Sequence, residues 1–232
     1  MIKKIVNFVL HKSFLERLQR AKKQIKNFCI LACDYGQWST IRDWNSVDKF
    51  SNPIPWYTYP ATEYLSHLDF SRLTVFEYGS GNSTLWWAKR AKSVFSVEDN
   101  KDWFEKISNN LANDSIQYLL KTDKDTYVSS APKDADVFII DGKHRRECAE
   151  HVVKFEGGVM IILDNSDWYP KTVEYLWASL GWLQVDFHGF GPINNYTWTT
   201  SIFVNPQRHN ELIYSEKLKS KFGLIQVAEG DY

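Results

Sequence analysis

Four acidic residues in this sequence each follow an apolar run, and their positions indicate a ligand-binding site. They are Glu77, Glu98, Asp141 and Asp164. One such acid would mean little, because loops are generally polar. The carboxyl ends of parallel strands, however, lie at one edge of a sheet, and α/β proteins bind ligands beyond that edge. We therefore expect the four carboxylates to meet at a common binding edge.

The first of these acids lies just before a glycine turn. Residues 75–84 read Val-Phe-Glu-Tyr-Gly-Ser-Gly-Asn-Ser-Thr, and the helix-prone residues 85–90 follow. This order predicts a buried strand, a tight turn and a helix start, the arrangement in which open α/β sheets hold nucleotide-like ligands. Glycine lets the backbone approach a ligand closely, and three polar side chains can cap the helix: Asn82, Ser83 and Thr84. The same pattern also occurs in ordinary turns.

The neighbouring acids separate two classes of ligand. Glu98 comes 17 residues after Gly81, close to the offset of about 20 residues at which an acid binds a ribose diol. A nicotinamide dinucleotide needs its pyrophosphate at the helix start, where Glu77 is unhelpful, and favours a third glycine in place of Thr84. S-adenosylmethionine has no phosphate, and its ammonium group would give a buried Glu77 the donor that it needs.

These residues resemble the class I S-adenosylmethionine-dependent methyltransferases. The similarity rests on residues 76–84, Val97-Glu98, Asp141 and Asp164, and covers about residues 55–205. It implies an α/β, Rossmann-like sheet of seven mostly parallel strands, with helices on both faces and the last strand antiparallel. It also implies S-adenosylmethionine as cofactor, bound by Glu77, Gly79, Ser80, Gly81, Asn82, Ser83, Thr84, Glu98, Asp99 and Asp141.

Two segments of the second half resemble a more specific group. Asp141 with the pair Asp164-Asn165 is similar to the metal triad of the catechol and caffeoyl-CoA type O-methyltransferases, which implies Mg²⁺ as a second cofactor. Hard oxygen ligands suit this ion, and it would lower the pKa of a bound hydroxyl. Asp141 then belongs to the catalytic set, with Lys143 or His144 as the group that removes the proton.

The basic residues 143–146 count against a metal, because they would repel a cation or bind an anionic substrate instead. The pattern Asp-Gly-x-x-Arg with Asp-Asn-Ser-Asp also resembles bacterial methyltransferases near surface-polysaccharide pathways. Asp164 and Asn165 could equally serve only to cap a helix or shape a loop. The glycine- and aromatic-rich loop 187–198 suits a lid over the substrate. We expect substrate contacts from Arg145, Asp167, Trp168 and His188.

The elements that must position these residues alternate along the chain from residue 73. The hydrophobic pattern predicts strands over 73–78, 93–97, 115–120, 135–140, 159–163, 182–187 and 199–204. It predicts helices over 83–90, 102–111, 145–155 and 171–180, and another that opens near Pro60. Strands and helices in this order favour a parallel sheet with crossover helices, completed by an antiparallel pair.

The N-terminal segment has a different character. Residues 1–27 contain eight Lys or Arg and one acid, so they carry +7, and the rest of the neutral chain carries −7. We divide the chain into a basic helical extension, residues 1–50, and a methyltransferase domain, residues 51–232. The extension predicts an amphipathic helix that contacts an anionic membrane or a partner. The alternative, which the sequence favours, is a solvated helix that packs its apolar stripe on its own domain.

The composition sets further bounds. Three cysteines without paired spacing indicate reduced thiols in a cytoplasmic protein, and no apolar run approaches the length of a membrane span. We expect an S-adenosylmethionine-dependent methyltransferase that acts on a hydroxyl of a small molecule or glycan, either in the cytoplasm or peripheral to the inner face of the membrane. The net acidic core disfavours nucleic acid as a partner, and a homodimer is compatible with the sequence but not required by it. The alternatives are an inactive, methyltransferase-like scaffold and a nicotinamide-dependent oxidoreductase.

Overall fold

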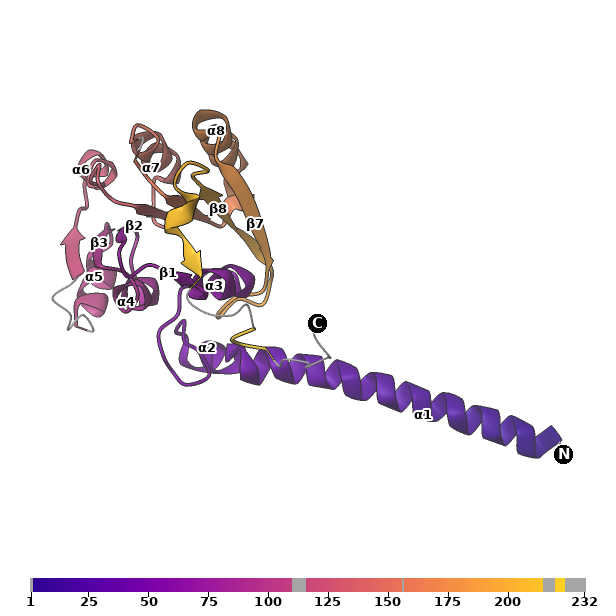
Figure 1. The fold of residues 1–232 in the computed structure, drawn as a ribbon. Coiled ribbons are helices and arrows are strands. Elements are labelled where there is room, and N and C mark those ends of the chain that lie inside the picture. The colour runs from indigo at the N-terminus through magenta and orange to yellow at the C-terminus, as the bar shows by residue number, and fades with distance from the viewer. Residues whose placement is uncertain (1, 110–115, 156, 215–219, 224–232) are drawn as a thin grey trace.

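A seven-stranded sheet runs through the protein, with helices on both of its faces (Figure 1). The computed structural model describes residues 2–109, 116–155, 157–214 and 220–223, with side chains from Phe14 onward. The strand order is β4-β3-β2-β5-β6-β8-β7. In chain order the strands are β2 (Thr74–Tyr78), β3 (Ser93–Glu98), β4 (Ile116–Leu120), β5 (Val137–Ile140), β6 (Met160–Asp164), β7 (Leu183–Gly189) and β8 (Trp198–Val204).

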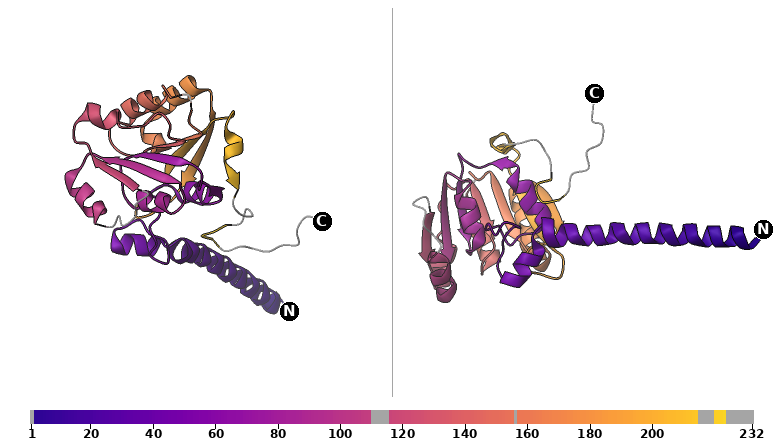
Figure 2. Two further views of the ribbon diagram at one scale, coloured as in Figure 1. Left: turned by 60° about the vertical axis from the view of Figure 1, so that its left-hand side comes forward. Right: turned by 90° about the horizontal axis from the view of Figure 1, so that it is seen from below.

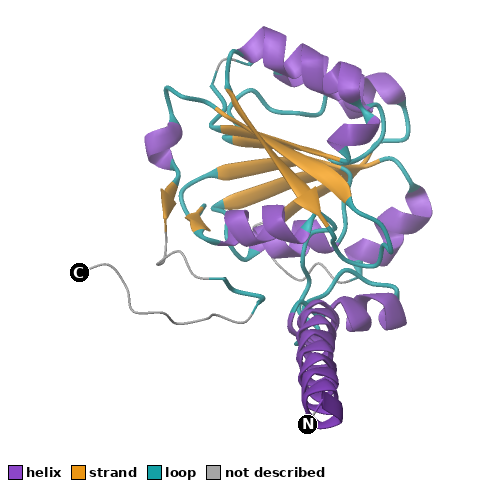
Figure 3. Cartoon of the chain, turned by 90° about the vertical axis from the view of Figure 1, so that its right-hand side faces the viewer, coloured by secondary structure: helices purple, strands orange, loops and turns teal. Residues whose placement is uncertain are grey.

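Six helices cover the sheet. The helices α3 (Tyr59–Ser66), α4 (Asn82–Ala88) and α5 (Lys101–Ser108) lie on one face, and α6 (Lys124–Val128), α7 (Arg145–Val152) and α8 (Pro170–Leu180) lie on the other (Figures 1 and 3). Because side chains alternate along a strand, each central strand contributes to two cores. Val75 and Ile139 pack in the core on the α3–α4 side, whereas Phe76 and Ile140 pack in the core on the α6–α8 side.

The sheet topology confirms the predicted fold class. Strands β2 to β6 pair in parallel, and β8 lies antiparallel between β6 and β7. The last strand of the large sheet is therefore the antiparallel one, as expected. The sequence did not predict α2 (Gln37–Asp43), α6 or the small antiparallel pair of β1 (Leu68–Asp69) with β9 (Ile213–Tyr214).

The N-terminal helix α1 (Ile2–Cys29) projects from the body of the protein as a rod (Figures 1 and 2). It continues through a π-helical turn (Ile30–Asp34) towards α2. The expectation that its apolar stripe packs on its own domain is wrong for the two stripe residues whose side chains are described, because Leu15 and Leu18 are 46% and 43% exposed. The other stripe residues, Ile5, Phe8 and Val9, lie outside the described side chains. Phe14, Ile25 and Phe28 of the same helix are 59%, 62% and 66% exposed. None of the helices in the described ranges combines the length and the apolarity needed to span a bilayer.

Two glycines allow the ends of β2 and β5 to meet. Gly79 has φ +91°, a conformation that favours glycine, and a Cβ atom there would lie 2.9 Å from the backbone nitrogen of Gly142. A Cβ atom on Gly142 would lie 2.8 Å from the nitrogen of Gly79 and 2.0 Å from the hydroxyl of Tyr127. The two turns therefore touch backbone to backbone, which brings the ends of both strands to one place.

We predict that Gly142→Ala destabilises the protein by more than about 2 kcal/mol, because backbone atoms cannot retreat from the added methyl group as a flexible side chain could. Urea unfolding of the purified protein measures this change. Gly157→Ala is the matched control, since no atom lies within 4 Å of a Cβ placed there. Equal stability of the two variants would contradict the close approach.

Candidate active site

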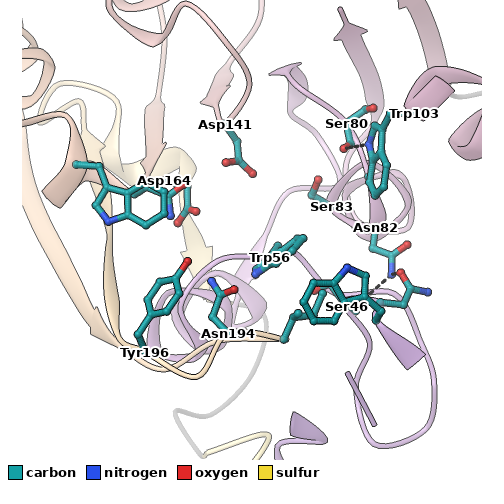
Figure 4. Close-up of a pocket in the computed structure, with 16 residues that line it drawn as sticks. Ser46, Trp56, Ser80, Asn82, Ser83, Trp103, Asp141, Asp164, Asn194 and Tyr196 are labelled. Atoms are coloured by element: carbon teal, nitrogen blue, oxygen red, sulfur yellow. Dashed lines mark hydrogen bonds between the residues drawn. The ribbon is translucent and has the colours of Figure 1, made fainter. Parts of the chain in front are cut away.

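A cavity of about 420 Å³ opens at the carboxyl edge of the sheet (Figure 4). The glycine turn, the ends of β5 and β6, the segment after α2 and the loop between β7 and β8 all contribute to its wall. Asp141, Ser83 and Asn194 face the same space from three of these elements (Figure 4). The lining consists of Trp44, Asn45, Ser46, Trp56, Ser80, Gly81, Asn82, Ser83, Trp103, Asp141, Asp164, Asn165, Trp168, Ile193, Asn194 and Tyr196.

A chain of hydrogen bonds shapes the glycine turn. The backbone N–H of Gly81 donates to the hydroxyl of Thr84 over 3.1 Å, and that hydroxyl donates to a carboxylate oxygen of Glu77 over 2.5 Å. Thr84 is fully buried at the position where a dinucleotide site favours glycine. The hydroxyl thus links the turn to the acid before it. This contact explains why a threonine, and not a third glycine, occupies the position.

Glu77 is a buried carboxyl group with one oxygen left over. Its Oε2 accepts hydrogen bonds from Thr84 and, over 3.2 Å, from Ser96, whereas Oε1 has no partner among the described residues. Burial raises the pKa of Glu77 to about 7, although nearby hydroxyl donors oppose the rise. An unpaired, buried acceptor of this kind suits a cationic or N–H ligand group.

Glu98 lies at the end of the next strand and is also buried. Its Oε2 accepts a hydrogen bond from the Ser80 hydroxyl over 2.7 Å, and its Oε1 accepts from the backbone of Asp99 and Asn100. Burial raises the pKa of this carboxyl group. The indole of Trp103 donates to the backbone oxygen of Ser80 over 2.8 Å and covers the glycine turn (Figure 4).

Asp141 and Asp164 form the acidic floor of the cavity. The Oδ1 atom of Asp164 accepts from the Trp198 indole over 3.1 Å and from the Thr200 hydroxyl over 2.5 Å. Burial raises the pKa of Asp141 to about 6, against the opposing charge of Arg145. Burial, together with the charge of Asp141, raises the pKa of Asp164 well above its usual range. Both carboxyl groups are therefore closer to accepting a proton at neutral pH than an exposed aspartate is.

The residues expected to hold Mg²⁺ do not fit that ion. The guanidinium of Arg145 donates to Asp141 Oδ1 and to Asn165 Oδ1, each over 3.1 Å, and to the backbone oxygen of Asp164. A cationic side chain thus engages the side-chain oxygens of Asp141 and Asn165 that a metal would need. Among the described residues, no group of three or more His, Cys, Asp or Glu side chains is placed to hold a metal ion.

Other predicted site residues lie away from the cavity. Lys143 forms an ion pair with Asp99 over 2.6 Å, and the ring of His144 lies against Tyr127. Neither residue lines the cavity. The expected substrate contact by Arg145 is replaced by contacts within the protein, because its guanidinium turns inwards.

Two further substrate candidates lie in a separate, shallow groove beside β7. Asp167 accepts a hydrogen bond from the backbone of Thr199, and the His188 ring contacts the hydroxyl of the same residue over 2.7 Å. Of the four expected substrate contacts, Trp168 alone lines the cavity. From the expected cofactor and metal sets, the structure brings to this wall Ser80, Gly81, Asn82, Ser83, Asp141, Asp164 and Asn165.

The rest of the wall combines Ile193, Asn194 and Tyr196 of the loop 187–198, which the sequence suggested as a lid, with segments to which the sequence assigned no role. The Asn82 amide donates to the side chain of Asn45 over 2.9 Å and to the backbone of Ser46 over 2.5 Å, which holds the segment after α2 across the glycine turn. Gln37 of α2 donates to the backbone of Gly191 and Asn194 over 3.3 Å. The polar character of residues 45–46 is the only sequence signal for these contacts, and it is a weak one.

Comparisons with known proteins agree on the fold. Precorrin-6y C5,15-methyltransferase from Geobacter metallireducens has a TM-score of 0.51 at 16% identity, over 71% of this chain and 95% of that chain. This similarity and the strand order reported above decide the architecture. This is the class I S-adenosylmethionine-dependent methyltransferase fold.

Two other solved structures are similar at lower scores. An rRNA methylase from Streptococcus thermophilus has a TM-score of 0.45 at 16% identity, over 63% of this chain and 96% of that chain. Trm5b from Pyrococcus abyssi has a TM-score of 0.44 at 18% identity, over 61% of this chain, which spans 46% of Trm5b. No protein-family model and no curated protein matches the sequence.

The cavity of this methyltransferase fold suits the cofactor for which the fold is named. Glu77 and Glu98 are not part of the cavity lining. The Oε1 of Glu77, unpartnered among the described residues, would suit an ammonium donor that reached it. Thr84, which donates to Glu77, occupies the position at which a dinucleotide site favours a third glycine. These features favour S-adenosylmethionine over a nicotinamide dinucleotide.

We predict that the free energy of unfolding falls as the pH rises from about 4.5 to about 7, because the folded state binds the Glu77 proton more tightly than the unfolded state does. Glu77→Gln removes this contribution to the pH dependence of the free energy of unfolding. The variant should therefore gain on the order of 2 kcal/mol over the wild type at pH 8 and nothing at pH 4. Urea unfolding at both pH values measures the difference.

The control is Glu105→Gln, whose carboxylate is 63% exposed and forms only a surface pair with Lys101. It should follow the wild type at both pH values. A Glu77→Gln variant less stable than the wild type at pH 8 would show that the folded protein keeps this carboxylate charged.

Proposed function

We propose that this protein transfers a methyl group from S-adenosylmethionine to a hydroxyl of a small molecule or glycan. The supporting observation is the continuity of the cavity: one wall is the glycine turn, and the floor carries Asp141 and Asp164. A cofactor held by the turn and an acceptor placed over the floor would therefore share one space.

The chain's own residues have distinct tasks in this proposal. Glu77 and Ser83 hold the amino-acid end of the cofactor. Glu98 accepts hydrogen bonds from the ribose hydroxyls after its hydrogen bond from the Ser80 hydroxyl breaks. S-adenosylmethionine, when bound, supplies an electrophilic methyl group. Asp141 accepts the proton of the attacking hydroxyl, because its raised pKa of about 6 is close to the operating pH. The acceptor gains a carbon–oxygen bond, and the sulfur keeps the electron pair of the broken carbon–sulfur bond.

The charge of the cavity supports an acceptor without phosphate groups. Its described lining has two acids and no basic side chain, so it offers no cationic partner to the phosphates of a polyanion such as RNA. Four partly exposed aromatic rings stand around the opening: Trp44, Trp56, Trp168 and Tyr196. Rings of this kind offer flat apolar surfaces for stacking, while Asn165 and Asn194 offer hydrogen bonds. This combination suits a sugar or another ring that carries hydroxyl groups.

We predict that the full-length protein binds S-adenosylmethionine and S-adenosylhomocysteine in titration calorimetry and that Glu98→Gln weakens both by about tenfold or more, because a charge-assisted hydrogen bond to the ribose is lost. Glu105→Gln should bind like the wild type. No binding of either ligand at millimolar concentration, or tighter binding of NADH, would reject the proposal and favour a scaffold or an oxidoreductase.

The N-terminal helix supports a second part of the proposal, a peripheral contact with an anionic membrane. Phe14, Leu18, Ile25 and Phe28 recur at intervals of four, seven and three residues, so they form one exposed stripe on α1. The surrounding segment, residues 1–27, carries +7. The same positive charge would make two copies of the helix repel each other, whereas acidic lipid head groups would attract it.

We predict that the full chain sediments with vesicles that contain phosphatidylserine and not with pure phosphatidylcholine vesicles. The double variant Ile25→Glu/Phe28→Glu should bind at least about tenfold more weakly, because it loses apolar area and gains negative charge. Trp177→Glu is the matched control: this side chain is 61% exposed on α8, away from α1. Equal sedimentation of all three proteins would reject membrane contact through α1.

A further inference from the structure

Arg145, the first residue of α7, is a buried cation surrounded by oxygen atoms of the protein. Its Nε donates to the backbone oxygen of Gly142 over 3.0 Å, and Nη2 donates to the backbone oxygen of Asp141 over 2.9 Å and to Asp141 Oδ1 over 3.1 Å. Its Nη1 donates to Asn165 Oδ1 and to the backbone oxygen of Asp164. The guanidinium therefore joins the end of β5 to the end of β6.

This set of acceptors overlaps with the one that a divalent cation would use. Two residues of the resembling metal triad, Asp141 and Asn165, give Arg145 a side-chain oxygen. Asp164 gives it the backbone oxygen, while the Oδ1 of its carboxylate accepts from Trp198 and Thr200. Carboxylate, amide and backbone oxygens are the ligands that Mg²⁺, Mn²⁺ and Ca²⁺ prefer. A second cation at this point would meet both repulsion from the guanidinium and oxygens that are already engaged.

The side chain next to it behaves differently, although it is also an arginine. Arg146 is partly exposed and pairs with Glu150 over 2.7 Å on the surface of α7. Both guanidinium groups lie over a tyrosine ring, that of Arg145 over Tyr169 at 4.8 Å and that of Arg146 over Tyr175 at 4.0 Å. The difference is that Arg145 alone of the two fits its fork of N–H groups to oxygens on both strand ends. The cationic role thus belongs to one position and not to the basic cluster as a whole.

We propose that Arg145 is the resident cation of this site and takes the place of a divalent metal. It is a positioning residue: it holds the carboxylate of Asp141 and the amide of Asn165 where the acceptor would bind, and the site works without a metal ion. The catalytic half of this inference rests on the proposed methyl transfer. The exclusion of a metal by Arg145 does not, because it concerns only the folded protein and an ion.

The test is a calorimetric titration of the full-length protein with Mn²⁺. The wild type should show no stoichiometric binding at millimolar Mn²⁺. Arg145→Ala should bind one ion with a dissociation constant at least about tenfold below the highest Mn²⁺ concentration used, because the freed oxygens can coordinate it. Arg145→Ala/Asp141→Asn should lose that binding again. Arg146→Ala, the matched control, should behave like the wild type.

A second measurement keeps the test decisive if Arg145→Ala folds poorly. Millimolar methylguanidinium should raise the melting temperature of Arg145→Ala and leave that of the wild type and of Arg146→Ala unchanged, since only the first variant has an open guanidinium position. Stoichiometric Mn²⁺ binding by the wild type that Asp141→Asn abolishes would overturn the proposal. So would a folded Arg145→Ala that responds to neither Mn²⁺ nor methylguanidinium.

These outcomes separate the two proposals. Failure of the wild type to bind S-adenosylmethionine would reject the methyltransferase function and leave the Mn²⁺ result unaffected. If methyl transfer occurs, it should proceed at an unchanged rate in EDTA, and loss of turnover in EDTA that added Mg²⁺ restores would overturn the role of Arg145.

Discussion

The burial of several carboxyl groups at one edge of the sheet is the constraint on which the site depends. Glu77, Glu98 and Asp164 are 1%, 6% and 2% exposed, and Asp141 stands beside them. Buried acids are tolerable only where donors surround them or where they keep their protons. A layer of hydroxyl donors and the single guanidinium of Arg145 meet this need; the hydroxyls belong to Ser80, Thr84, Ser96 and Thr200. The shape of the glycine turn follows from the same requirement.

The fold was predictable because local patterns and strand order determine most of it. Each central strand is a continuous apolar run, which predicts burial on both faces, and the observed strands differ from the expected ones by one or two residues at most ends. The helix α2 was not predictable: it has seven residues, begins after Gly36 and buries only Thr40. It is held by tertiary contacts to a loop more than 150 residues away, and no local pattern encodes such contacts.

The site was predictable only where the backbone alone positions a residue. Several turn residues and the ends of β5 and β6 lie at the cavity, because the topology of the sheet brings them to one edge. Glu77 and Glu98, near the ends of β2 and β3, do not line it. Side-chain direction could not be read in the same way. Lys143, His144 and Arg145 are consecutive, yet the first two turn towards Asp99 and Tyr127 and the third turns into the protein. His144 has a positive φ of +53°, which changes the direction of the backbone between Lys143 and Arg145. No feature of the sequence indicated this conformation.

The contacts of α2 connect the N-terminal extension, residues 1–50, to the loop between β7 and β8 that lines the cavity. The hydroxyl of Thr40 accepts the backbone N–H of Ile193 over 2.8 Å, and Gln37 binds the backbone on both sides of that residue. Ile193 has φ +65°, a strained conformation for a β-branched residue that persists only where its surroundings impose it. The extension therefore helps to impose the shape of the loop that lines the cavity. Helix α2 and two hydrogen-bonding side chains therefore link the extension, which is proposed to contact a membrane, to the loop that lines the cavity.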